Sequence, residues 1–129
     1  MKKQYYPQLD ETVIWDTLPN GLTIAVVPKK GFQKKLAYFV TNYGSIHTQF
    51  RLDGEAVKVP DGVAHFLEHK MFERDPDRYG GSDSYDDDFA ACGAESNAYT
   101  SHDRTVYYFS CTDRFPDALT ALLSMVSEL

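Results

Sequence analysis

Two histidines and a glutamate stand close together in the middle of the chain, as His65, Glu68 and His69. Residues 63–73 contain no helix-breaking residue before Pro76, which predicts a helix there. Residues four apart lie on the same face of a helix, so the imidazoles of His65 and His69 come within the separation that two ligands of one tetrahedral Zn²⁺ require. Zinc held by neutral imidazoles lowers the pKa of a bound water to about 7, and a nearby carboxylate takes the proton as hydroxide attacks a carbonyl. The spacing therefore predicts Zn²⁺ as the cofactor and Glu68 as the general base of a hydrolase.

The same helix has an apolar side. At about 100° per residue, His65, Glu68 and His69 occupy an arc of roughly 100°. The apolar residues that fall largely outside this arc are Val63, Ala64, Leu67 and Met71. We expect Asp61 to cap the helix, and we expect the apolar side to pack on a core while the three polar side chains face a site. The alternative is a solvent-facing helix side that carries ordinary polar residues and no metal.

Turn signals organise the chain before this helix. The Asn20-Gly21 pair predicts a hairpin between strands at 12–15 and 22–27. Residues 36–41 are expected to form a further strand, and residues 44–60 are expected to form a polar loop. The N-terminal part is therefore predicted to be β-structure.

An acidic loop, residues 74–88, is predicted to lead into a short helix that Ser82 or Ser84 caps and Gly93 ends. Its run 83–88 has the composition of a calcium site, but it lacks the Gly at position six and the Glu at position twelve of an EF-hand loop. Acidic residues favour a helix N-terminus, so we interpret the run as a solvated helix start.

The last part of the chain combines a strand with a helix. Residues 105–110 are β-branched or aromatic and predict a strand. Behind Pro116, apolar residues recur at helical spacing, at Leu119, Leu122, Leu123 and Val126. The order of elements predicts an α+β fold, a two-layer sandwich in which helices cover one face of a mainly antiparallel sheet. Because the last helix reaches Leu129 without a stop signal, we expect the chain to be truncated inside a longer protein.

Composition narrows the classes of partner. The 129 residues are 43% hydrophobic and 25% charged, which is typical of a folded domain rather than a disordered one. A net charge of -6 argues against nucleic acid or an anionic membrane as a partner, because both need a basic surface. The N-terminus has no apolar signal segment, so we expect a cytoplasmic protein in which Cys92 and Cys111 are free thiols.

The sequence His-Phe-Leu-Glu-His at 65–69, preceded by Gly62-Val63-Ala64, closely resembles the inverted zinc motif of the pitrilysin/insulinase (inverzincin) family of metallopeptidases. Further segments resemble that family in the same order, at 18–22, 43–45, 93–100 and 103–107. The resemblance implies a zinc endopeptidase in which His65 and His69 bind the metal and Glu68 is the catalytic base. It also implies that Asn97, Ala98 and Thr100 line an edge where a peptide substrate adds as a strand. Residues 1–129 are then the N-terminal part of one insulinase-like domain. On composition alone, Ser96-Asn97 would instead be a turn.

The chain also departs from that family. The family's third ligand is a Glu about 75 to 80 residues beyond the second His, whereas this sequence ends at Leu129, before that distance. Glu128 is the only late candidate, and it lies in a region that matches the segment before the family's ligand helix. Such enzymes also use a second homologous half or subunit that closes over the peptide. We therefore expect the site to be incomplete in this chain and the chain alone to be inactive.

Two other classes of function stay open. A non-catalytic peptide-binding or partner subunit would keep the fold without the chemistry, and a metal-free structural domain would bind no zinc. His47 and His102 lie in predicted loops and are expected to be ordinary exposed side chains.

Overall fold

The computed structural model describes residues 1–128, which divide into two compact units that are described separately below. The first unit, Met1–Phe32, is a three-stranded antiparallel sheet of β1 (Lys2–Tyr6), β2 (Glu11–Thr17) and β3 (Thr23–Val26) in the order β1-β2-β3. None of its side chains is fully buried. This unit is therefore held together mainly by its hydrogen-bonded ladders.

The predicted hairpin between β2 and β3 is confirmed. Gly21 has a φ of 89°, which a side chain would strain, and the Asn20 side chain accepts a hydrogen bond from the Leu22 amide (3.1 Å). Strand β1 was not predicted, because its sequence Lys-Lys-Gln-Tyr-Tyr has no alternating aliphatic pattern.

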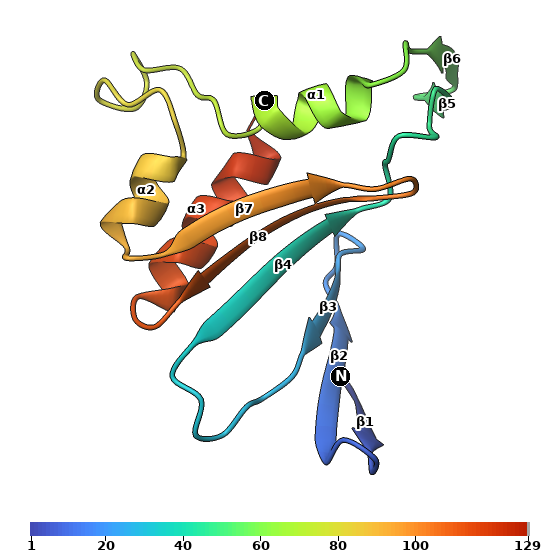
Figure 1. Ribbon diagram of the computed structural model, residues 1–129. Coiled ribbons are helices and arrows are strands. Elements are labelled where there is room, and N and C mark those ends of the chain that lie inside the picture. Colours follow the sequence, from blue (N-terminus) through green and yellow to red (C-terminus); the bar gives the residue numbers. More distant parts are fainter. Residues whose placement is uncertain (129) are drawn as a thin grey trace. The chain divides into compact units, whose positions relative to one another are not determined.

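The second unit begins at Gln33 and is built on the antiparallel sheet β4-β8-β7 (Figure 1). Its strands are β4 (Lys35–Thr41), β7 (Glu95–Thr100) and β8 (Thr105–Cys111), with β8 in the centre. A separate hairpin joins β5 (Gln49–Leu52) to β6 (Glu55–Lys58).

Three helices cover one face of this sheet (Figure 1). They are α1 (Val63–Lys70), α2 (Asp86–Ala91) and α3 (Phe115–Ser127). Side chains from β8, from α2 with its N-cap, and from α3 form the core, in which the largest fully buried side chains are Tyr85, Phe89, Phe109, Leu122 and Met125. The predicted α+β class, with mainly antiparallel sheets and helices on one face, is confirmed.

Two local predictions were wrong. Residues 49–58 form the β5–β6 hairpin rather than a loop, and its turn, Asp53-Gly54, has positive φ at both residues. Asp-Gly between short strands is itself a hairpin signal, so the sequence did contain this information. The N-cap of α1 is Gly62 rather than Asp61. Residues 96 and 97 lie inside β7, as the family resemblance implied, and not in the turn that composition alone favoured.

Candidate metal centre

Helix α1 packs on the sheet, where it contacts strands β7 and β8. Two of its side chains are buried, Ala64 and Glu68, which are one helical turn apart. His65 and His69 are exposed on the neighbouring side of the helix. The helix therefore rests on the sheet through Ala64 and Glu68 and presents its histidines outward.

The two histidine rings point at each other. Their Nε2 atoms are 3.1 Å apart, and the ring centroids are 4.8 Å apart. Two nitrogens that each lie about 2.0 to 2.1 Å from a tetrahedral zinc are about 3.3 Å apart, so the observed separation fits two ligands of one zinc ion. The pair could hold zinc with little movement of the helix.

Glu68 completes the cluster. Ligand atoms of His65, Glu68 and His69 all lie within 4.8 Å of one another, and within residues 1–128 this is the one group of three or more His, Cys, Asp or Glu side chains placed to hold a metal. The structure thus brings together the three residues that the motif predicted.

The orientation of Glu68 differs from the expectation. Its side chain is only 7% exposed, and one carboxylate oxygen accepts a hydrogen bond from the hydroxyl of Thr100 at the end of β7 (2.5 Å). Tyr107 on β8 lies nearby: burial, and secondarily the charge of Glu68, raise the pKa of its hydroxyl to about 12. Glu68 therefore faces the sheet rather than open solvent.

Leu67 shows the opposite departure. It was expected to pack on the core but is 38% exposed, and it lines a cavity of about 260 Å³. The cavity is mostly apolar, and its walls include Ala64 and Met71 from the helix side and Phe39 from the sheet. An apolar cavity thus lies between the sheet and the side of α1 that carries Ala64, Leu67 and Met71, which is not the side that carries the histidines.

Strand β7 forms one edge of the β4-β8-β7 sheet within the described part of the chain. Asn97 is exposed on the face opposite Ala98 and Thr100, and its side-chain oxygen accepts a hydrogen bond from the Ala98 amide (2.8 Å). The side chain of Thr100 is engaged with Glu68. The three residues expected to line a substrate edge therefore lie on an edge strand, but their side chains face different ways.

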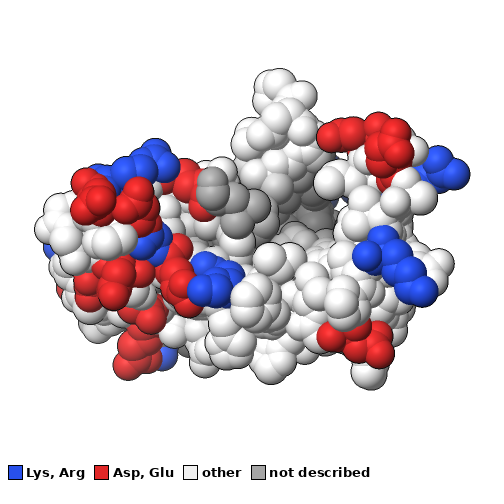
Figure 2. All heavy atoms as spheres, turned by 90° about the horizontal axis from the view of Figure 1, so that it is seen from above, with Lys and Arg blue, Asp and Glu red and all other residues white. Residues whose placement is uncertain are grey.

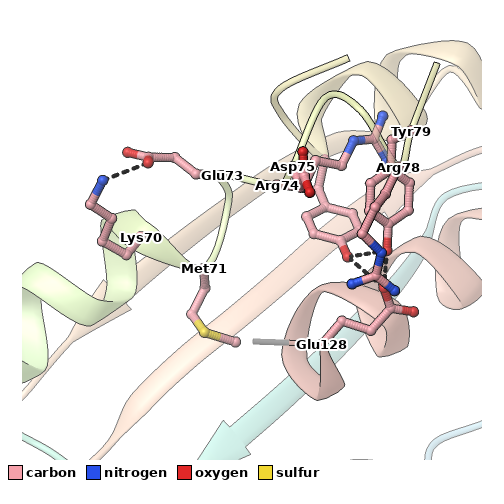
Figure 3. Close-up of a pocket in the computed structure, with 9 residues that line it drawn as sticks. Lys70, Met71, Glu73, Arg74, Asp75, Arg78, Tyr79 and Glu128 are labelled. Carbon is pink, nitrogen blue, oxygen red and sulfur yellow. Dashed lines mark hydrogen bonds and ion pairs between the residues drawn. The ribbon is translucent and has the colours of Figure 1, made fainter. Parts of the chain in front are cut away.

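Other polar residues lie outside the cluster. The carboxylate of Glu128 accepts hydrogen bonds from the hydroxyls of Tyr79 and of Tyr85 (3.4 Å for the latter) in a separate cavity of about 330 Å³ (Figure 3). His47 accepts a hydrogen bond from the Gly44 amide (2.9 Å), and His102 contacts Ser45. None of these side chains belongs to the metal-ligand group among residues 1–128.

The acidic run has structural partners. Arg74, whose buried guanidinium lies against the rings of both Tyr79 and Tyr85, makes an ion pair with Asp88 (2.5 Å). The Ser84 hydroxyl accepts a hydrogen bond from the Asp86 amide at the start of α2 (3.2 Å). Helix α2 begins at Asp86, so the acidic residues stand at a helix start as predicted, but its N-cap is Tyr85 rather than Ser82 or Ser84. Acidic side chains gather at the end of the second unit that carries α2, while the surface toward α1 is mostly uncharged (Figure 2).

The sequence did not reveal that Thr100 hydrogen-bonds to the glutamate or that the charge of Glu68 acts on Tyr107. The alternation of exposed and less exposed residues in β7 could have placed Ala98 and Thr100 on the inner face, but not beside Glu68. That juxtaposition depends on where the helix crosses the sheet.

Comparison with known proteins agrees with this geometry. The sequence profile described as Insulinase (Peptidase family M16) matches residues 55–128. The chain is 46% identical over 126 residues to the uncharacterized zinc protease YmfH of Bacillus subtilis, covering 95% of this chain and 28% of that protein. It is 43% identical over 103 residues to insulin-degrading enzyme-like 2 of Arabidopsis thaliana, covering 79% of this chain and 10% of that protein.

A solved structure shares the fold. The crystal structure of a putative M16-like peptidase from Alicyclobacillus acidocaldarius matches with a TM-score of 0.81 and 40% identity, over 92% of this chain and 26% of that one. The chain thus spans only about a quarter of the length of YmfH and of this structure. Within the described residues, no helix has the length and apolar character needed to cross a membrane.

Proposed function

Because this chain belongs to the insulinase family of peptidases, family M16, we propose that it provides part of the active site of a zinc-dependent endopeptidase. The observation that carries the proposal is the pair of facing imidazole nitrogens, 3.1 Å apart, with a buried glutamate beside them. Relatives that are named zinc proteases support the choice of metal.

His65 and His69 would hold the zinc ion through their Nε2 atoms. Zinc bound there would polarise the scissile carbonyl and favour deprotonation of the attacking water. Glu68 would not bind the metal, because a carboxylate bound to the metal would lose the basicity that the reaction needs. Its carboxylate accepts the proton of the attacking water and then delivers it to the leaving amine.

A peptide substrate would add as an extra strand along the free edge of β7. Backbone groups near Asn97 and Ala98 would pair with the peptide backbone, which is how extended peptides add to sheet edges.

The site needs a further ligand. Among residues 1–128, His65, Glu68 and His69 are the group placed to hold a metal. We therefore propose that another protein ligand completes the metal site. We also propose that a second homologous half or subunit covers the peptide. Full activity then belongs to the whole protein.

The first test is zinc binding by the whole protein. After dialysis against a trace of zinc, elemental analysis should find about one zinc per chain, and His65→Ala or His69→Ala should lose it. His102→Ala is the matched control, since this histidine lies outside the cluster, and it should keep the metal. A wild-type whole protein without zinc would refute the proposal.

The second test is hydrolysis of a quenched fluorescent peptide by the whole protein. Glu68→Gln should retain zinc and lose at least about 100-fold in kcat, because the amide cannot accept the proton. If the whole protein binds zinc and peptide but cleaves nothing, the non-catalytic partner subunit becomes the better description.

A further inference from the structure

The buried position of Glu68 requires a polar partner. A carboxylate removed from water costs free energy unless hydrogen bonds compensate it. Glu68 is 7% exposed while its neighbours His65 and His69 are exposed. Among residues 1–128, the side chain that donates a hydrogen bond to this carboxylate is Thr100.

Thr100 is well suited to hold that carboxylate still. It is the last residue of β7, on the face that α1 covers, and it pairs with Thr105 of the central strand β8. A β-branched side chain in a strand has restricted χ1 freedom, so its hydroxyl has a fixed position. The pairing of β7 with β8 therefore fixes the position of the Thr100 hydroxyl, and the hydrogen bond from this hydroxyl fixes one carboxylate oxygen of Glu68.

We propose that Thr100 is a positioning residue for Glu68. Its hydroxyl holds the carboxylate against the sheet and within reach of the two imidazoles, whose ring nitrogens lie within 4.8 Å of it. This inference rests on the proposed function, in which Glu68 carries the proton. In this inference the Thr100 side chain positions the general base, Glu68, whereas the family resemblance implies that Thr100 contacts the substrate.

The strand geometry supports this assignment. Side chains alternate between the two faces of β7, so Asn97 points away from α1 and Thr100 points toward it. The hydroxyl that donates to Glu68 is thereby engaged before any peptide arrives. The substrate edge would use the backbone of β7, and the inner face would serve the base.

Three variants test the proposal. Thr100→Val removes the donor with almost no change in shape, and Thr100→Ser restores it. Thr105→Val is the matched control: this neighbouring, buried threonine donates to the carbonyl oxygen of Tyr43 (2.8 Å) and not to Glu68.

Kinetics of the whole protein give the first readout. Thr100→Val should lower kcat by roughly 10- to 100-fold, with KM and zinc content changed by less than about two-fold, because a displaced base slows the chemical step without altering binding. Thr100→Ser should recover most of the loss. Thr105→Val should leave kcat within about two-fold of wild type.

A second readout needs neither zinc nor activity. In the metal-free chain, Thr100→Val should lower Tm by roughly 3 to 8 °C, and by less than about 2 °C when Glu68 is already replaced by alanine. A Tm loss of the same size in both backgrounds would show that the hydroxyl does not act through Glu68, and would overturn the proposal.

The results of these experiments distinguish the positioning role of Thr100 from the proposed zinc peptidase function. Unchanged kcat in Thr100→Val, or no recovery in Thr100→Ser, overturns the positioning role while leaving the zinc peptidase intact. A joint loss of zinc and kcat in Thr100→Val assigns a structural role to Thr100 and also overturns it. If wild type binds no zinc and cleaves nothing, the proposed function fails, and the positioning role in catalysis fails with it; the Tm comparison then reports only on the contact.

Discussion

Helices α1 and α3 lie on the same face of the β4-β8-β7 sheet, yet they are held there by different side chains. Helix α3 has 13 residues and buries a stripe of apolar side chains, Ala118, Ala121, Leu122 and Met125. Helix α1 has eight residues and buries only Ala64 and Glu68, of which one is a carboxylate. An isolated helix of that length is unstable in water, so α1 depends on its contacts with the sheet. The comparison indicates that α3 supplies much more apolar burial to the core than α1, the helix that carries the histidine pair.

The largest expected effect is in α3. Leu122 is 1% exposed in the core, so Leu122→Ala should reduce the free energy of unfolding by about 2 to 5 kcal/mol through lost burial and a cavity. The same change at the next residue, Leu123→Ala, should cost less than about 1 kcal/mol, because Leu123 is 42% exposed. Urea denaturation measures both. Equal costs would contradict the assignment of the stripe.

Zinc should stabilise the chain through α1. At a free zinc concentration 100 times its Kd, the free energy of unfolding should rise by about 2.7 kcal/mol, because zinc binds the folded histidine pair preferentially. His65→Ala should abolish this rise, and His102→Ala should not. Thermal unfolding with and without zinc measures the effect, and a rise that persists in His65→Ala would place the metal elsewhere.

The next prediction concerns Tyr107 of strand β8, whose ionisation should make the stability of the fold depend on pH. Burial, and secondarily the charge of Glu68, raise the pKa of Tyr107 to about 12, against about 10 in the unfolded chain. The protonated hydroxyl therefore contributes stability that is complete below pH 10 and is lost as the pH rises toward 12. Wild type should lose stability relative to Tyr107→Phe across that window. A constant difference between the two proteins from pH 9 to pH 12 would refute this.

The smallest effect should be at the exposed side of α1. Phe66 is 59% exposed, so Phe66→Ser should change the free energy of unfolding by less than about 0.5 kcal/mol. Zinc affinity should stay within about two-fold of wild type, since Phe66 is not a ligand. A larger loss of stability would mean that another surface covers this side chain.

The fold was predictable where a local pattern decided it. The helical spacing behind Pro116 predicted α3, and Asn20-Gly21 predicted the β2–β3 turn. Strand β1 was missed because its pattern is weak. The β5–β6 hairpin was missed although its Asp53-Gly54 turn is a recognised signal.

The candidate site was only partly predictable. The sequence by itself determined that His65 and His69 share a helix face with Glu68 close by, because helical geometry fixes residues three and four apart. It did not determine which side of that helix meets the sheet. Glu68 lies only about 40° around the helix from Ala64, so it can turn inward with Ala64 or outward with the histidines. Only the tertiary structure decided this, because the partner of Glu68 is Thr100, 32 residues further along the chain on another element.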